Sequence, residues 1–166
     1  VNDPGVDSIL LHIDSPGGTV DGTESLSETI RAAREIKPVV AFADGTMASA
    51  AYWVGSAASE IVASSNTDQI GSIGVVTSHT DISEAEAKAG VKTTEISAGK
   101  YKRIASRHAP LSAEGAEVLQ DHVDQLYTIF VDDVAENRGV TSDVVLDDMA
   151  DGRVFLSRQA ERRGMI

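Results

Sequence analysis

The sequence contains no cysteine. This absence excludes a disulfide framework, a thiol nucleophile and a zinc site with cysteine ligands. Long apolar runs are missing as well, because no stretch approaches the roughly 18 residues of a membrane span. The first residues, Val1–Gly5, have neither the basic nor the apolar region of a targeting signal. The sequence therefore predicts a soluble chain, and a membrane anchor is expected only if flanking sequence carries one.

Basic residues are few, since 14 Lys and Arg stand against 26 Asp and Glu and the net charge is −12. Because such a surface repels phosphates, we expect no nucleic-acid partner. Apolar residues make up 42% and charged residues 24%, which are ordinary values for a globular protein. A length of 166 residues is sufficient for one core and too short to argue for two. We therefore expect one domain over residues 1–166.

Short apolar runs alternate with segments of helical periodicity along the chain. Strands are expected at 8–13, 39–43, 60–63, 73–77, 91–96 and 153–156. Helices are expected at 25–36, 48–59, 83–90, 119–134, 142–149 and 157–163. Ser25 with Glu28, and Ser83 with Glu86, have the spacing of capping boxes at two of these helices. The alternation predicts an α/β fold with βαβ units and a mainly parallel sheet.

A glycine pair follows the first expected strand, in the turn Asp14–Gly18. Sites in α/β proteins form at the carboxyl ends of strands, where loops lead into helices. Paired glycines expose backbone N–H groups there and let a ligand approach closely. Alternatively, Asp14–Gly18 is a simple turn from strand to helix.

A serine, Ser49, begins the second expected helix within the small-residue segment Gly45–Trp53. Small neighbours leave its hydroxyl accessible, and the helix N-terminus offers free N–H groups to an oxyanion. This pattern is compatible with a nucleophile. Alternatively, Ser49 only caps the helix.

A basic cluster, Ser97–Arg103, interrupts this acidic sequence and contains Lys100 and Lys102. A lysine that is desolvated in a closed site can be neutral near pH 7 and accept the proton of a serine hydroxyl. The cluster thus offers a base for serine chemistry. Alternatively, it is a solvated loop that balances charge.

The four histidines give little support to a Ser-His-Asp site. They lie in a strand run, in two loops and on a long helix, at His12, His79, His108 and His122. The Gly-x-Ser-x-Gly motif of α/β-hydrolases is missing, and so is a His-Glu-x-x-His metal motif. The α/β-hydrolase route is therefore disfavoured, and metal catalysis has no support.

Five motifs, taken in order, resemble the signal-peptide-peptidase family of Ser-Lys proteases and especially its bacteriophage branch of head-maturation proteases. They are Asp14–Gly18, Ala48–Trp53, Gly71–Val75, Ser97–Lys102 and Gly152–Phe155. The resemblance spans nearly the whole chain. It implies a crotonase-like fold, shared with the Clp proteases, of repeated β-β-α units with a mainly parallel sheet.

The resemblance also implies roles for individual residues. Ser49 is the nucleophile, and Lys102, directly after a tyrosine, fits the position of the base better than its rival Lys100. Ser72 orients the lysine amine. The oxyanion hole is formed by the N–H groups of two further residues, Gly18 and Ala50. The substrate-binding residues are Gly17, Gly74 and Val75.

The chain departs from the family pattern at Ala50 and Ala51, where glycines are usual, but alanine keeps the backbone N–H that an oxyanion needs. Family members also carry a strand and a helix before the segment where this chain starts. We therefore expect the chain to lack an N-terminal strand and helix, and also a C-terminal tail.

The resemblance implies a homo-oligomer, in which serine and lysine come from one chain or from two, and a polypeptide substrate with small or apolar residues near the cleaved bond. It implies no cofactor and no metal. A cytoplasmic or procapsid location fits the phage branch. Two other interpretations stay open: a crotonase-type acyl-CoA enzyme that needs neither Ser49 nor Lys102, and a catalytically silent capsid-assembly scaffold.

Overall fold

The computed structural model describes all residues from Val1 to Ile166. The chain divides into two compact units. Unit 1 comprises residues 1–75 and 126–166, and unit 2 comprises residues 76–125. Each unit is described by itself below.

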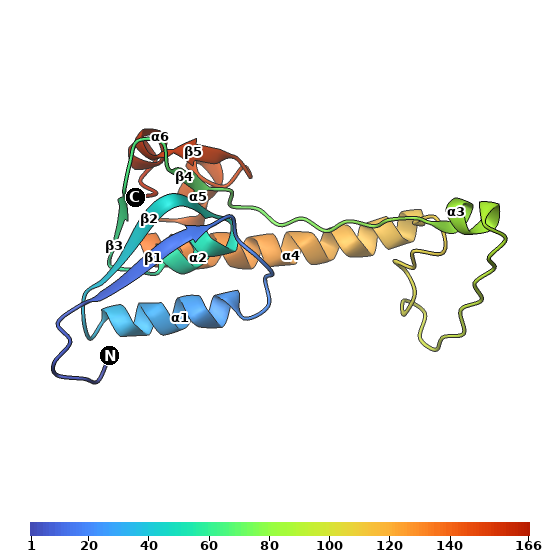
Figure 1. The fold of residues 1–166 in the computed structure, drawn as a ribbon, viewed down its shortest axis with the longest axis horizontal. Coiled ribbons are helices and arrows are strands. Elements are labelled where there is room, and N and C mark those ends of the chain that lie inside the picture. Colours follow the sequence, from blue (N-terminus) through green and yellow to red (C-terminus); the bar gives the residue numbers. More distant parts are fainter. The chain divides into compact units, whose positions relative to one another are not determined.

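Unit 1 contains a five-stranded mixed sheet (Figure 1). Its strands are β1 (Ile9–Ser15), β2 (Val39–Ala48), β3 (Glu60–Ala63), β4 (Gln69–Gly71) and β5 (Val154–Leu156). The strands β1, β3 and β4 all pair with β2 in parallel, and β5 pairs with β4 in antiparallel orientation. The prediction of an α/β fold with a mainly parallel sheet is confirmed.

Helices of unit 1 cover one face of β1 and β2. They include α1 (Thr23–Arg34) and α2 (Ala50–Ser56), which pack on each other and on these strands (Figure 1). The end of α4 (Ala113–Arg138) joins them, because Trp53 of α2 stacks on Phe130 of α4 with ring centroids 4.4 Å apart. Two short helices, α5 (Ser142–Asp148) and α6 (Ser157–Arg162), complete the unit. The expected helices at these places are confirmed.

A buried carboxylate joins three helices beneath the sheet. Asp133 of α4 is only 8% exposed, and it accepts hydrogen bonds from Ser27 Oγ at 2.6 Å, from Arg31 at 2.7 Å and from the indole N–H of Trp53. A buried charge is tolerated when it is paired and hydrogen-bonded in this way. Asp133 therefore ties α1 and α2 to α4.

Unit 2 contains α3 (Ser83–Lys88), the first part of α4 and the loops between them. Polar contacts hold these loops together: His79 Nε2 lies 2.9 Å from the Ser106 carbonyl oxygen, and His108 Nδ1 lies 2.8 Å from Glu86 Oε1. Two of the four histidines, His79 and His108, therefore stabilise the loops of unit 2.

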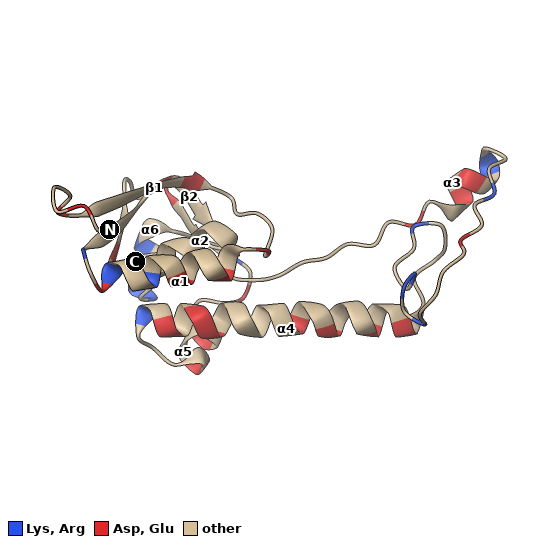
Figure 2. Ribbon diagram, turned by 90° about the horizontal axis from the view of Figure 1, so that it is seen from below, with Lys and Arg blue, Asp and Glu red and all other residues tan.

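Acidic residues recur along α4 (Figure 2). The helix carries seven Asp or Glu against one Arg: Glu114, Glu117, Asp121, Asp124, Asp132, Asp133, Glu136 and Arg138. No helix of the chain is both long enough and apolar enough to cross a membrane.

Two expected strands are wrong. Residues 73–77 form none, because Gly71 and Ser72 both take positive φ angles, 114° and 52°, which end the strand at β4. Residues 91–96 form none either, because no neighbouring strand pairs with them, and Ile96 is 97% exposed. β-branched residues favour a strand only where a neighbouring strand is available to pair with them.

Both capping boxes are wrong as well. Helix α1 begins after Gly22, a left-handed residue without a side-chain cap. At α3 the Ser83 N–H donates to Asp81 Oδ1 at 2.8 Å, while Glu86 is engaged by His108 and Thr93. The N-cap residues are Gly22 at α1 and Ile82 at α3, so neither Ser25 nor Ser83 occupies the position that a capping box requires.

Candidate active site

Three parallel strands end side by side in unit 1. Ser15 of β1 pairs with Met47 of β2, and Ala48 of β2 pairs with Gly71 of β4. The glycine turn after β1, Ser49 after β2 and Ser72 after β4 therefore leave the same edge of the sheet. This edge is the carboxyl end at which ligand sites of parallel sheets form.

Ser49 occupies a strained turn from strand to helix. Its φ and ψ are 53° and −126°, and its side chain makes no capping hydrogen bond. Such a conformation costs a non-glycine residue about 1–3 kcal/mol and is retained only where the surroundings enforce it. Here the Ser49 N–H donates to the Gly71 carbonyl at 2.7 Å, and the Ser49 carbonyl accepts from Trp53 N–H at 3.0 Å. The interpretation of Ser49 as a simple helix cap is therefore not favoured.

This geometry is that of a nucleophile elbow, in which a sharp turn between strand and helix presents a serine hydroxyl. Sequence inspection missed it, because Met47 and Ala51 occupy the two positions where the Gly-x-Ser-x-Gly motif has glycines. The space comes instead from Gly17. A Cβ at position 17 would lie 2.7 Å from Ser49 Cβ and 2.9 Å from the Ala48 carbonyl oxygen.

Gly17→Ala is expected to damage the site, and Gly18→Ala is its matched control. Gly17 has a φ of 112° and no room for a methyl group, whereas nothing lies within 4 Å of a Cβ at Gly18. We expect Gly17→Ala to lower the free energy of unfolding by about 2–4 kcal/mol, since overpacking and left-handed strain add. Gly18→Ala should change it by less than about 1 kcal/mol. Urea denaturation of both variants measures the difference, and equal stabilities would contradict this account of the contact.

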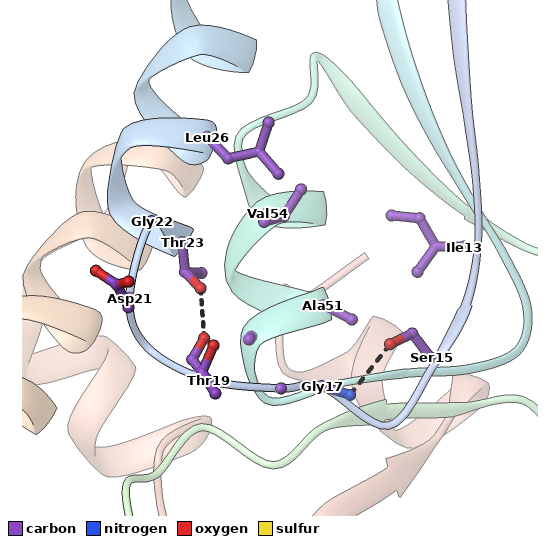
Figure 3. Close-up of a pocket in the computed structure, with 12 residues that line it drawn as sticks. Ile13, Ser15, Gly17, Thr19, Asp21, Gly22, Thr23, Leu26, Ala51 and Val54 are labelled. Atoms are coloured by element: carbon purple, nitrogen blue, oxygen red, sulfur yellow. Dashed lines mark hydrogen bonds between the residues drawn. The ribbon is translucent and has the colours of Figure 1, made fainter.

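Gly18 and Ala50 line one cavity of about 450 Å³ in unit 1. Figure 3 shows this cavity, with the neighbouring residues Gly17 and Ala51 labelled. The Gly18 N–H donates to no acceptor within the chain, and the Ala50 N–H, at the first position of α2, is one of those that have no intrahelical partner. Both donors are thus available to a ligand beside Ser49. The Gly17 N–H is engaged by Ser15 Oγ at 3.2 Å.

The same cavity has an apolar wall that sequence reasoning missed. It is formed by Ile13, Leu26, Ala51 and Val54, from β1, α1 and α2 (Figure 3). Leu26 lies at helical spacing from the buried Ile30, but it is 49% exposed and lines this cavity. Helical spacing cannot distinguish a side chain that lines a cavity from one that fills a core.

Ser72, Gly74 and Val75 lie just beyond β4 and are half-buried. The Ser72 N–H donates to the Arg153 carbonyl at 2.8 Å, and Gly152 N–H donates to the Ile73 carbonyl at 3.1 Å. Two of the sequence motifs, around Gly71 and around Gly152, are thus brought together. Ser72 shares with Ser49 a positive φ, and these are the only two non-glycine residues that have one.

Lys102 belongs to unit 2, whereas the other candidate residues belong to unit 1. Its neighbours are engaged: Lys100 Nζ lies 2.6 Å from Glu114 Oε1, and Arg103 is paired with Glu95. Lys102 is exposed and forms no ion pair in the chain. The hydrogen bonds from Lys100 to Glu114 and to Tyr101 raise the pKa of Lys100 above its ordinary value. The Lys100 amine is thus already engaged by partners of its own, whereas no ion pair engages Lys102.

Fold and site together define an α/β protein with a strained serine at the carboxyl end of a central parallel strand and two free backbone N–H groups beside it. This is the arrangement of enzymes that attack through a serine. The model of the family described as "Peptidase family S49" matches residues 31–166, which is most of the chain. The chain belongs to peptidase family S49.

Curated relatives agree with this assignment. The chain is 35% identical over 164 residues to "Capsid assembly protease C" of Escherichia phage lambda, covering 99% of this chain and 37% of that protein. It is 34% identical over 158 residues to "Serine protease SPPA, chloroplastic" of Arabidopsis thaliana, covering 95% and 23%. It is 33% identical over 165 residues to "Protease 4" of Salmonella typhi, covering 99% and 26%. The chain spans about half the length, or less, of the relatives it matches.

Proposed function

We propose that this chain is the catalytic portion of a serine endopeptidase that cleaves extended or unfolded polypeptides with a Ser-Lys dyad. The observation that carries the proposal is the strained Ser49 beside the free N–H groups of Gly18 and Ala50. Membership of a peptidase family supports it. We further propose the crotonase-like fold of the Clp proteases, which a parallel sheet with a serine at its carboxyl edge supports.

In the proposed reaction Ser49 Oγ attacks the peptide carbonyl carbon while its proton passes to the amine of Lys102. The carbonyl oxygen becomes an oxyanion, and the N–H groups of Gly18 and Ala50 donate to it. Lys102 then gives the proton to the leaving amine as the bond from carbon to nitrogen breaks. Water, deprotonated by the same amine, hydrolyses the acyl-serine and restores Ser49. Ser72 would hold the lysine amine toward Ser49.

The apolar cavity supplies a place for the substrate side chain on the acyl side of the cleaved bond. That side chain leaves the carbon next to the attacked carbonyl, and the cavity opens at the same residues that would hold the oxyanion, Gly18 and Ala50. Leu26 and Val54 would contact it. Asp21 also lines the cavity and disfavours an acidic side chain there. Small and apolar residues are therefore the proposed preference, and Gly17, Gly74 and Val75 are proposed to line the peptide backbone.

Val54→Phe tests this proposal, because a larger ring would fill the cavity. We expect kcat/KM to fall by about 10- to 100-fold for peptides with leucine before the cleaved bond, and much less for alanine. Mass spectrometry of fragments from an unfolded protein substrate measures the preference. Ile36→Ala is the control, since Ile36 is an exposed apolar residue just after α1 that does not line the cavity. An unchanged cleavage pattern in Val54→Phe would refute the role of the cavity, and no cleavage by the unaltered chain would refute the function.

We propose that the active form is a homo-oligomer, in the cytoplasm or in a phage procapsid. The similarity to a protein named for capsid assembly supports the phage branch, but "Protease 4" and the chloroplastic protease match equally well. The acyl-CoA and scaffold alternatives do not require a strained serine. The geometry of Ser49 therefore favours the peptidase over both.

A further inference from the structure

We infer that Asp14 is a positioning residue that clamps a bulge in β2 and thereby sets Ser49 against the glycine turn. The inference rests on the proposed role of Ser49. Asp14 opens the motif Asp14–Gly18, whose glycines have roles in the site, but the mechanism above gives its carboxylate none. The structure shows where that carboxylate goes.

The bulge interrupts the pairing of β1 with β2. Ile13 pairs with Ala43, but Ser15 pairs with Met47, so Asp14 alone stands opposite the three residues Asp44–Thr46. Asp14 Oδ1 accepts the Thr46 N–H at 3.1 Å. Gly45 makes this approach possible, because a Cβ at that position would lie 2.9 Å from the same oxygen. Bulges of this kind re-aim a strand and are frequent beside active sites.

The clamp lies at equal chain distance from both halves of the site. Asp14 precedes Gly17 by three residues on one strand, and Thr46 precedes Ser49 by three residues on the other. Gly17 and Ser49 are in direct contact. The hydrogen bond between Asp14 and Thr46 therefore fixes how far the glycine turn and the serine turn extend beyond the sheet relative to each other.

A second carboxylate holds the other side of the bulge. Asp68 is 3% exposed, and its Oδ1 accepts the Gly45 N–H at 3.2 Å while it also accepts from Ser64 and Ser65. Burial raises the pKa of Asp68, but these hydrogen bonds outweigh burial and lower it below its ordinary value. At the bulge β2 changes partner from β3 to β4. Asp68 thus holds the bulge from the β4 side, and Asp14 holds it from the β1 side. Asp14 is exposed, so its side chain can be replaced without disturbing the core.

The test compares Asp14→Ala with Asp14→Asn. Loss of the acceptor lets the two turns shift, and a misplacement of about 1 Å can cost on the order of 100-fold in rate. We expect Asp14→Ala to lower kcat by about tenfold or more while KM changes by less than about twofold, because substrate contacts are kept. Asp14→Asn retains the Oδ1 acceptor and should restore kcat to within about threefold of the unaltered chain. Asp14→Leu, which keeps the branched shape without an acceptor, should behave like Asp14→Ala.

Two controls separate the clamp from a general effect. Asp44→Ala removes an exposed carboxylate of the bulge itself, whose partner is His12, and should leave kcat unchanged. Hydrogen exchange of the Thr46 amide should accelerate in Asp14→Ala and not in Asp14→Asn. This second measurement requires no catalysis, so it tests the clamp independently of the proposed function. Ser49→Ala, assayed alongside, tests that function.

Several outcomes would overturn the inference. They are an unchanged kcat in Asp14→Ala, a failure of Asp14→Asn to restore it, an equal loss in Asp44→Ala, and an unaltered exchange rate at Thr46. Failure of both Asp14→Ala and Asp14→Leu to fold would also overturn it, because Asp14 would then hold the fold rather than the site.

Discussion

Ser49→Ala should abolish peptide cleavage and leave the fold intact. Removal of a catalytic serine lowers kcat by about 10⁴-fold or more, because the remaining groups cannot replace the covalent step. The fold should persist, because the Ser49 hydroxyl makes no capping bond and the contacts that hold the turn come from its backbone N–H and carbonyl. Alanine keeps both groups. Cleavage of an unfolded protein substrate, followed by electrophoresis, measures the loss.

Ser25→Ala is the matched control for this experiment. Ser25 is an exposed serine in the first turn of another helix, α1, and lies outside the site. It should cleave like the unaltered chain. The unfolding midpoints of both variants should lie close to the original. Cleavage retained in Ser49→Ala would rule out the nucleophile, whereas equal losses in the two variants would point to a contaminating protease or to damage of the fold.

Lys102→Ala should reduce cleavage by about 10³-fold or more, while Lys100→Ala should reduce it by less than about threefold. The physical reason is the difference between their amines. Lys100 is held in its charged form by Glu114 and Tyr101, whereas Lys102 has no ion-pair partner in the chain. The two lysines lie two positions apart in one loop, so each is the other's control. A larger loss in Lys100→Ala than in Lys102→Ala would reverse the assignment.

The two inactive variants can also be combined. If the dyad is shared between subunits, a mixture of Ser49→Ala and Lys102→Ala restores activity, because an intact serine of one chain meets an intact lysine of another. If both residues act within one chain, the mixture stays inactive. Cleavage by the mixture, compared with each variant alone, therefore decides between the two arrangements of the oligomer.

Much of the fold could be predicted where a single chemical pattern decides the structure. The run before Asp14 and the segment Glu60–Ala63 became strands within one or two residues of their predicted bounds. The helix expected at 119–134 is part of the longer α4. Predictions failed where the structure of a segment depends on a partner distant in the sequence. Residues 91–96 have a strand-like pattern, but they pair with no strand of the sheet.

The sequence suggested residue types for the candidate site but could not give its geometry. Ser49, Gly18 and Ala50 were proposed from the sequence, and they lie in two turns that leave the same edge of the sheet in unit 1. The strained backbone of Ser49 was not expected, because the glycine that leaves room for it, Gly17, lies in a different turn, after β1. The apolar wall was missed for a similar reason. It combines side chains of β1, α1 and α2, and no sequence window contains all of them.

The contact between Gly17 and Ser49 has a consequence for engineering. The turn that presents the serine contains no glycine of its own, so its room is supplied by a segment about thirty residues earlier in the chain. A library that randomises only the residues around the serine explores shapes already limited by that earlier segment. Positions 17 and 48–51 must instead be varied together. A larger residue in one segment requires the backbone of the other segment to move away.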